Sequence, residues 1–492
     1  MSNQKKLTLF AFILMILTSV FGVLNIGIGF FRMGYSGIPF FIIGGLFFFI
    51  PFILMMIEFG SGFKKEHGGI FSWMQKSVNT RFAFIGIMMW YASYVIWMFG
   101  KSFSIWVPLS FLVFGEDITT NPVTFGTKID FGTLILGIIG VLLIVSISYL
   151  ITKGTSKLAK VAAIGGLSVI ALNVILLVGG IIVFFINGMQ LQEPLNMTTI
   201  LQSPNADFQS VIPALGFVVF AVFAYGGVEA MAGIADDLQN PQRDLKRGIF
   251  IAGAFTVFCY VFGFLMVGSI MSWSEFGGNV GSLQSLFIIM YNLGVSIGGE
   301  ILGQILMKFT GIGMFLSFAG AMIALAYAPL KQLIGGTPKE FWPASFQVKN
   351  KAGISVAAVK AQAIIVIIFI VAKAVLSLIS PEGANKLYEL IITMTNVAMT
   401  IPYLFLIIAW YRYRQNSKLE KDLIFFKSKV SILFAFVSTF ILVTFGNVFT
   451  ILDPFLSGKW ETGIWTIIGP IIFVLLALII LKRAKSINKD LV

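Results

Sequence analysis

Residues 221–230 read Ala-Val-Phe-Ala-Tyr-Gly-Gly-Val-Glu-Ala, and residues 236–244 follow with Asp-Asp-Leu-Gln-Asn-Pro-Gln-Arg-Asp. The first segment places two adjacent glycines, Gly226 and Gly227, and one carboxylate, Glu229, inside an apolar run. Adjacent glycines loosen a helix, and a carboxylate in hydrocarbon is costly enough to indicate a task. A broken helix beside an acid is typical of transporters that bind a small polar solute near the middle of the membrane.

The composition of the whole chain is that of a helical membrane protein. Hydrophobic residues make up 58% of the 492 residues, and only 11% are charged. Apolar runs of about 20 residues, the length that spans a bilayer, recur from one end of the chain to the other. We therefore expect an all-α polytopic membrane protein.

The net charge of +13 is explained by topology. Most Lys and Arg residues, such as Lys64, Arg243 and Lys482, lie in loops on the side that holds both termini, whereas the opposite loops carry acids such as Glu116 and Asp207. This positive-inside bias predicts that both termini face the cytoplasm. A charge distributed in this way gives no reason to expect nucleic-acid binding.

Metal and cofactor chemistry finds little support in the sequence. His67 is the only histidine and Cys259 the only cysteine, so histidine-based metal sites and internal disulfides are excluded. No Gly-x4-Gly-Lys-Ser/Thr nucleotide signature occurs. We expect no cofactor, no metal and no enzymatic activity, because one loop histidine cannot supply a paired catalytic arrangement at membrane depth.

The apolar runs predict twelve transmembrane helices. Their approximate bounds are 7–31, 38–60, 81–112, 131–152, 158–187, 209–235, 247–271, 300–330, 355–379, 386–411, 430–451 and 463–482. Two loops, at 282–296 and 337–346, are expected to hold short helices.

The first and sixth spans differ from the others in their glycines. The glycines of the first span surround Asn25, and those of the sixth are adjacent; they are Gly22, Gly27, Gly29 and Gly34, and Gly226 and Gly227. These spans lie five apart and run in opposite directions, which predicts an inverted repeat of five plus five helices with a site where broken helices 1 and 6 meet. The alternative is that the glycines merely let helices pack closely.

This repeat would divide the chain into a transport core and a C-terminal part. The core would be residues 1–411, with the first repeat at about 7–187 and the second at about 209–411. Residues 412–492 would add helices 11 and 12 and a short cytoplasmic tail.

Several motifs together resemble those of the amino acid–polyamine–organocation superfamily of permeases. Within it, the chain resembles the bacterial glutamate/γ-aminobutyrate antiporter group, in a branch of inner-membrane transporters. The motifs are Glu-Phe-Gly at 58–60 with Gly-Gly-Ile-Phe-Ser-Trp at 68–73, Phe-Ala-Tyr-Gly-Gly-Val-Glu at 223–229, Asn-Pro-Gln-Arg at 240–243, and Ala-Lys-Val at 159–161.

The resemblance implies a leucine-transporter-like fold in the bacterial cytoplasmic membrane. It further implies secondary active transport of an amino acid, or of its decarboxylated amine, by alternating access, with glutamate/γ-aminobutyrate-type exchange or proton-coupled uptake. The chain departs from the group in three places: its first break lacks an acid and an aromatic residue, it has no long C-terminal plug, and lysines stand at positions 101 and 308. These differences leave the substrate open.

Backbone at the two breaks would bind the solute. Free N–H groups at the start of a half-helix suit a carboxylate, and free carbonyls at the end of one suit an ammonium. The residues at the first break are Val23, Leu24, Asn25, Ile26 and Gly27, and those at the second are Ala224, Tyr225, Gly226 and Gly227. Tyr225 is either a gate over the solute or an ordinary packed tyrosine.

Three ionisable residues within the predicted spans are candidates for coupling or gating. Glu229 is a proton carrier or gate acid, or else makes a structural hydrogen bond. Lys101 and Lys308 either snorkel to the interface or match the side-chain carboxylate of a solute such as glutamate, and Lys308 alternatively pairs with Glu300. The charges at the end of the second span, Glu58 among them, are interpreted as interfacial. The glycine pair at 68–69 is expected to make a tight turn that leads into a short helix.

Two other functional readings stay open. One is a transporter-like amino acid sensor without flux. The other is a sodium-coupled symporter, for which Thr310 and Ser317 leave room. The expected partners are the lipid bilayer and a small amino acid. The sequence does not determine the oligomeric state, and a homodimer is one arrangement compatible with it.

Overall fold

The computed structural model of the chain is helical. It describes residues 9, 22–63, 69–153, 155–227, 241–277, 281–351 and 353–488. The longer elements are α2 (Val23–Met33), α4 (Ile50–Gly62), α6 (Thr80–Ser104), α8 (Gly132–Lys153), α9 (Thr155–Ile186), α11 (Val211–Phe223), α12 (Pro241–Ile270), α13 (Ser285–Gly336), α15 (Val356–Ile379), α16 (Pro381–Gln415), α17 (Lys429–Leu456) and α18 (Trp460–Ile487). The shorter elements are η1 (Gly34–Gly37), α3 (Ile38–Ile43), η2 (Gly44–Phe49), α5 (Ile70–Ser77), α7 (Trp106–Val113), α10 (Met197–Leu201), η3 (Ala206–Phe208), η6 (Trp273–Phe276), η7 (Lys339–Phe341) and α14 (Ala344–Gln347).

The helices of the described residues are long and apolar enough for a membrane. Ten helical runs among them could cross a bilayer by length and composition, and α11 is a shorter apolar helix. Each predicted span from the second to the twelfth overlaps one of these helices, whereas the first, at 7–31, lies mostly outside the described residues. The all-helical class is therefore confirmed, and the count of twelve and the inverted repeat stay predictions.

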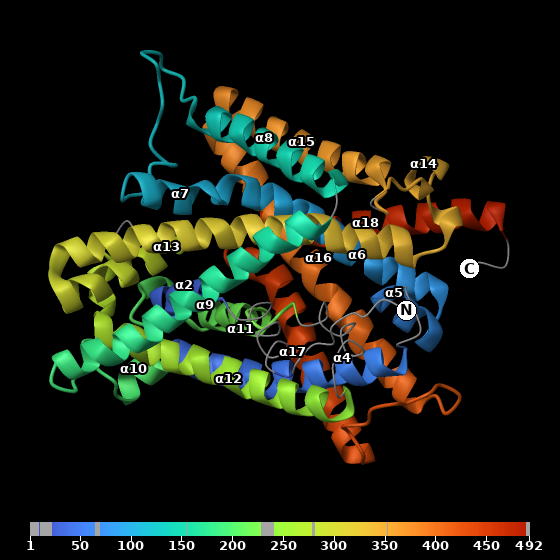
Figure 1. Cartoon of the computed structure of the whole chain (residues 1–492), viewed down its shortest axis with the longest axis horizontal. Coiled ribbons are helices and arrows are strands. Elements are labelled where there is room, and N and C mark those ends of the chain that lie inside the picture. The colour runs from blue at the N-terminus through green and yellow to red at the C-terminus, as the bar shows by residue number, and fades with distance from the viewer. Residues whose placement is uncertain are drawn as a thin grey trace.

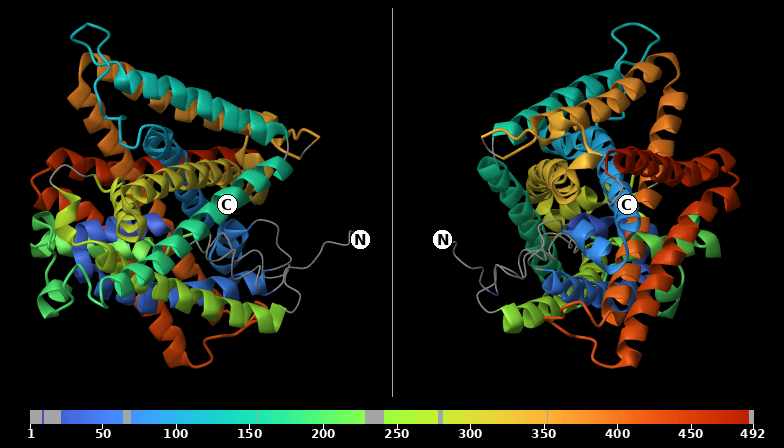
Figure 2. Two further views of the ribbon diagram at one scale, coloured as in Figure 1. Left: turned by 60° about the vertical axis from the view of Figure 1, so that its left-hand side comes forward. Right: turned by 90° about the vertical axis from the view of Figure 1, so that its right-hand side faces the viewer.

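The long helices form one bundle around α6. That helix packs against α16, α13, α15 and α8, while α9 packs along α13. The pair α8 and α15 forms one side of the molecule, and α12 lies on the opposite side (Figure 1 and Figure 2). Large apolar side chains such as Ile138, Leu142 and Ile368 are exposed on the outside of that pair. Such a broad apolar exterior is what a lipid-facing surface requires.

A sharp turn at Gly34 connects α2 to α3. The backbone of Gly34 has φ 54° and ψ −143°, a conformation that glycine adopts without strain. The chain then returns along α2, so that a side chain at Gly29 would lie 3.3 Å from the ring of Phe41. Residues 23–62 thus form one helical run, and this run reverses its direction at the Gly34 turn.

The two predicted short helices are both present. Gly298 and Gly299 interrupt α13 with non-helical backbone, at φ −146° and φ 79°, so the stretch that begins at Ser285 is a separate short helix. After the C-terminal end of α13, the short helices η7 and α14 lie in the second predicted loop, at 337–346. Gly69, with φ 55°, precedes α5, in agreement with the tight turn expected at the glycine pair.

Candidate functional site

The first predicted break is the start of α2. Gly22 precedes that helix in an extended conformation, with φ −121° and ψ 116°, and the backbone N–H of Asn25 donates to its carbonyl at 2.9 Å. The residues Val23–Gly27 therefore form the first turn and a half of a helix. A first helical turn leaves backbone N–H groups without intrahelical acceptors, so this end of α2 can receive a carboxylate.

The second predicted break follows the last residue of α11. After Phe223 the chain enters a turn at Ala224–Gly227, in which Tyr225 donates to Val222 and Gly226 donates to Phe223. The φ of Gly227 is 107°, which is open to glycine and strained for other residues. Among the described residues, α11 thus ends at Phe223, just before the glycine pair, and the broken helix stays a prediction. Glu229 lies outside the described residues.

The hydroxyl of Tyr260 joins the two breaks. This buried α12 residue accepts from the backbone N–H of Gly22 at 3.3 Å and from the Asn25 side-chain amide at 3.2 Å, and it donates to the carbonyl of Ala224 at 3.1 Å. Sequence reasoning missed it. A tyrosine inside an apolar span was the available signal, because its hydroxyl needs partners where water is absent.

Tyr225 is packed in this conformation. It is fully buried, its hydroxyl donates to the carbonyl of Phe41 at 2.8 Å, and its ring stacks on Phe49 with 4.9 Å between centroids. These are the contacts of the second alternative, a tyrosine with a satisfied hydroxyl. A gating role for Tyr225 stays a prediction.

The other predicted break residues are buried or half-buried. Val23 and Ile26 are buried, and a side chain at Gly27 would lie 3.1 Å from the backbone of Leu286. Leu24, Gly226 and Gly227 are half-buried, and a side chain at Gly226 would lie 2.8 Å from the hydroxyl of Tyr403.

A cavity of about 620 Å³ reaches both breaks. We call it the break cavity; its lining residues are Asn25, Arg32, Trp97, Gly216, Val219, Phe220, Phe223, Ala224, Met399, Thr400, Phe449, Thr450, Asp453 and Pro454. They come from α2, α6, α11, α16 and α17. Sites for small molecules commonly measure 300–1,000 Å³, so this volume is ample for an amino acid.

Lys101 lies behind the wall of the break cavity. Its ammonium stands 3.7 Å from the ring centroid of Phe318 and 5.3 Å from that of Trp97, which lines the cavity. Sequence reasoning missed Lys373 of α15, whose ammonium also lies over an aromatic ring, 3.8 Å from the ring centroid of Tyr388. Neither lysine forms an ion pair within the described part of the chain, so aromatic faces stabilise both cations.

Lys308 is not near these groups. It is exposed on α13, as is Glu300, and within the described ranges no ion pair joins the two. The structure therefore brings Asn25, Ala224 and Lys101 toward one cavity and leaves Lys308 on the outer surface. A coupling role for Lys308 stays a prediction.

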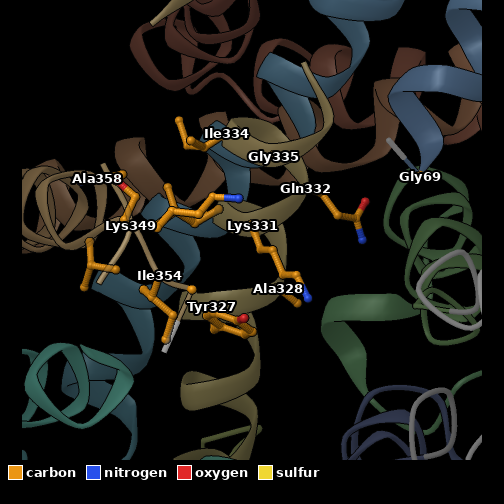
Figure 3. Close-up of a pocket in the computed structure, with 14 residues that line it drawn as sticks. Gly69, Tyr327, Ala328, Lys331, Gln332, Ile334, Gly335, Lys349, Ile354 and Ala358 are labelled. Atoms are coloured by element: carbon orange, nitrogen blue, oxygen red, sulfur yellow. Dashed lines mark hydrogen bonds between the residues drawn. The ribbon is translucent and has the colours of Figure 1, made fainter. Parts of the chain in front are cut away.

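A second cavity of about 620 Å³, here named the loop cavity, lies near the other end of the bundle. The residues around it come from α13, from the start of α15 and from the turn at Gly69 (Figure 3). Lys331 and Lys349 are the charged residues of its lining. The loop cavity thus includes part of the glycine motif that precedes α5.

A hydrogen-bonded contact joins three of the helices that line the two cavities. The Tyr91 hydroxyl donates to the side-chain carbonyl of Gln362 at 2.9 Å, and the amide of Gln362 donates to the carbonyl of Ala326 at 2.8 Å. Tyr91 lies six residues before Trp97 on α6, and Gln362 lies one turn beyond Ala358 on α15. This contact therefore ties α6, α15 and α13 together between a residue of the break cavity and a residue of the loop cavity.

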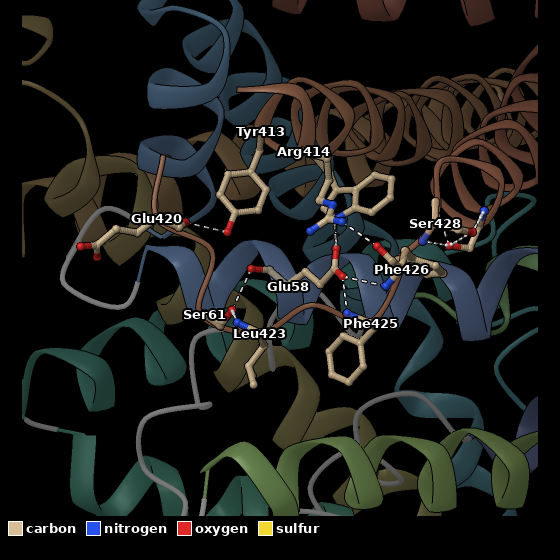
Figure 4. A network of polar contacts seen from close by, with 11 residues as sticks. Glu58, Ser61, Tyr413, Arg414, Glu420, Leu423, Phe425, Phe426 and Ser428 are labelled. Atoms are coloured by element: carbon tan, nitrogen blue, oxygen red, sulfur yellow. Dashed lines mark hydrogen bonds and ion pairs between the residues drawn. The ribbon is translucent and has the colours of Figure 1, made fainter. Parts of the chain in front are cut away.

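The interpretation of Glu58 as an interfacial charge is wrong. Glu58 is completely buried in α4, and its carboxylate accepts from the backbone N–H groups of Phe425 and Phe426 and from the Trp410 indole at 3.1 Å (Figure 4). The guanidinium of Arg414 lies 3.6 Å from it.

Further contacts extend this arrangement, which we call the Glu58 network. Ser61 accepts from the backbone N–H of Leu423, and Arg414 donates to the carbonyl of Phe426 at 2.6 Å (Figure 4). The loop between α16 and α17 is thereby bound to α4. The sequence placed Glu58 at the end of a span but could not show which distant loop covers it.

Comparison with known proteins agrees with this architecture. A family model described as amino acid permease matches residues 7–476. The chain is 38% identical to the inner membrane transporter YjeM of Salmonella typhimurium, over 98% of this chain and 97% of that protein.

More distant relatives carry more specific names. The glutamate/gamma-aminobutyrate antiporter of Lactococcus lactis is 24% identical over 83% of this chain and 76% of its own length. The aspartate/glutamate permease AcaP of Lactococcus lactis is 23% identical over 99% of both chains. Because the family model covers nearly the whole chain and the YjeM protein matches over its full length, this protein belongs to the amino acid permease family, a family of membrane transporters rather than enzymes.

Proposed function

We propose that the protein is a secondary active transporter that moves an amino acid, or its decarboxylated amine, across the cytoplasmic membrane by alternating access. The observation that carries this proposal is the convergence of the two helix breaks on one cavity. Asn25 and Ala224 both line this cavity, and the Tyr260 hydroxyl is hydrogen-bonded to both residues.

The groups at this convergence suit a zwitterion. The start of α2 presents backbone N–H groups and the positive end of a helix dipole, which favour a carboxylate. The end of α11 presents carbonyl oxygens, which favour an ammonium. Val23–Gly27 and Ala224–Gly227 would thus bind through main-chain atoms, which need small side chains around them rather than charged ones.

The two cavities support alternating access. The break cavity and the loop cavity lie toward different ends of the bundle, and the contacts of Tyr91 and Gln362 join α6, α13 and α15, which contribute to the two linings. We propose that the solute passes from one cavity to the other when these contacts open. In this proposal the core is the five-plus-five repeat within residues 1–411, both termini are cytoplasmic, and Glu229 is the coupling or gate acid.

Acidic amino acids are the first substrates to test. Relatives at 23–24% identity are named for glutamate, aspartate and γ-aminobutyrate, and Lys101 adds positive charge beside the break cavity. Exchange of glutamate for γ-aminobutyrate and proton-coupled uptake are the two coupling modes that we propose to compare.

The test is uptake by purified protein in proteoliposomes. Labelled amino acids are offered with an internal counter-substrate, with a pH gradient and with a sodium gradient. Uptake that needs the counter-substrate indicates exchange, and uptake driven by one ion gradient identifies that ion. Binding of an amino acid without flux in all conditions would contradict the proposal and favour the sensor alternative.

A further inference from the structure

Among the described residues, the lining of the break cavity holds one positive and one negative side chain. They are Arg32 of α2 and Asp453 of α17, and both are half-buried. Within the described residues, neither forms an ion pair. Charges inside a membrane protein are costly unless they face a partner or a water-filled space, so their position at a cavity indicates use.

The guanidinium of Arg32 lies over two aromatic rings. Its carbon lies 5.1 Å from the ring centroid of Phe220 and 5.9 Å from that of Phe208. Such a cation–π contact uses none of the N–H donors of the guanidinium. These donors match a carboxylate in a bidentate geometry.

The polar neighbours of Asp453 have their donors in use. Thr450 donates to the carbonyl of Gly446 at 2.7 Å, and Thr400 donates to the side chain of Asn447 at 2.6 Å. The Asn25 amide donates to Tyr260. Arg32 and Asp453 are therefore the strongest groups in the cavity that can serve a mobile solute.

These charges do not lie at the breaks themselves. Arg32 follows Asn25 by seven residues on α2, a rise of roughly 10 Å along a helix. Arg32 therefore lies near the end of α2 that is remote from the first predicted break.

We propose that Arg32 and Asp453 form a separate recognition site in the break cavity, in which Arg32 receives the carboxylate and Asp453 the ammonium of the amino acid before it reaches the breaks. The inference rests on the proposed function and deepens it by naming the substrate class: molecules that carry both charges. It predicts that the protein discriminates against analogues that lack either one.

The test uses substrate analogues against charge-removing variants. The best amino acid of the proteoliposome screen is compared with its α-methyl ester, which lacks the α-carboxylate, and with its N-acetyl derivative, which lacks the ammonium. Each analogue competes with the labelled amino acid for wild type, Arg32→Gln and Asp453→Asn. Lys360→Gln, at an exposed position of α15, is the matched control for loss of one charge.

The variants should lose selectivity in opposite ways. Arg32→Gln should lower the preference for the free acid over the ester about tenfold and leave the preference over the N-acetyl derivative within twofold. Asp453→Asn should do the reverse, and Lys360→Gln should change neither ratio. Arg32→Lys should retain part of the preference, because it keeps the charge but not the bidentate edge.

A second measurement separates recognition from transport and from folding. The shift in unfolding temperature on adding each analogue is measured in detergent for every variant. Suppose that Arg32→Gln and Asp453→Asn fold like wild type and keep the wild-type preferences for the free amino acid over its ester and over its N-acetyl derivative. This result would overturn the recognition site and leave the proposed transport function untouched. A wild-type protein that binds amino acids with these selectivities but shows no flux would overturn the transport function alone, and one that neither binds nor transports any amino acid would overturn both.

Discussion

Glu58 and Arg32 lie on the same helical run, Val23–Gly62, yet their surroundings differ sharply. The carboxylate of Glu58 accepts three hydrogen bonds and faces the guanidinium of Arg414, and no part of Glu58 is exposed. Arg32 stacks on rings, faces a cavity and has no ion pair within the described residues.

The difference separates a structural charge from a charge that can bind. A carboxylate with a full set of donors has little left to offer a solute, and removing it strands its partners. A guanidinium with open edges at a cavity can bind and release a carboxylate repeatedly. We therefore expect substitutions near Glu58 to act on stability and substitutions around the break cavity to act on transport.

The largest expected effect is that of Glu58→Gln on stability. The change leaves the buried guanidinium of Arg414 without its opposite charge, and breaking a buried pair typically costs about 3–5 kcal/mol. Unfolding temperature in detergent and protein level in the membrane measure it. A variant as stable as wild type would show that the Glu58 network does not hold the loop between α16 and α17 to α4.

Tyr260→Phe should come next, with its main effect on transport. Loss of the hydroxyl leaves the carbonyl of Ala224 and the amide of Asn25 short of a partner, at about 1–3 kcal/mol. We expect uptake to fall about tenfold or more while most of the protein stays folded.

Tyr35→Phe is the matched control for that prediction. Tyr35 is also buried, but its hydroxyl has no hydrogen-bond partner among the residues that the structure describes. Removal of this hydroxyl should therefore change uptake little. Equal uptake by the two variants would contradict a role for Tyr260 in joining the breaks.

Lys101→Met should alter selectivity with a moderate effect. The ammonium of Lys101 stands beside the ring of Trp97 at the cavity wall. A charge acting at such a range contributes on the order of 1 kcal/mol at a protein dielectric, so uptake of glutamate relative to leucine should fall about fivefold. The same ratio is measured for Lys308→Met, and an equal fall there would exclude a local effect.

The smallest expected effect is that of Glu461→Gln. Glu461 forms an ion pair with Lys386, but both side chains are more than half exposed, at 57% and 54%. Exposed pairs contribute about 0–1 kcal/mol, so the unfolding temperature should barely change. A loss comparable to that of Glu58→Gln would show that burial is not what distinguishes the two carboxylates.

Local sequence signals predicted the elements well. The apolar runs predicted the long helices, and Gly69 and the pair Gly226–Gly227 predicted a turn and a helix end, because these features depend on residues adjacent in the chain. The deep acid expected at Glu229 lies outside the described residues. Sequence reasoning also found Asn25, but as a supplier of backbone rather than as a side chain bonded to Tyr260.

The sequence by itself determined a helical membrane protein, because the length of an apolar run is a local property. Only the tertiary structure decided which charges have partners. It buried Glu58 beneath a loop from the last third of the chain, joined the breaks through Tyr260 and brought Arg32 and Asp453 to one cavity. The physical reason is that electrostatic and hydrogen-bond partners are set by helix packing, which residue type and spacing along the chain do not specify.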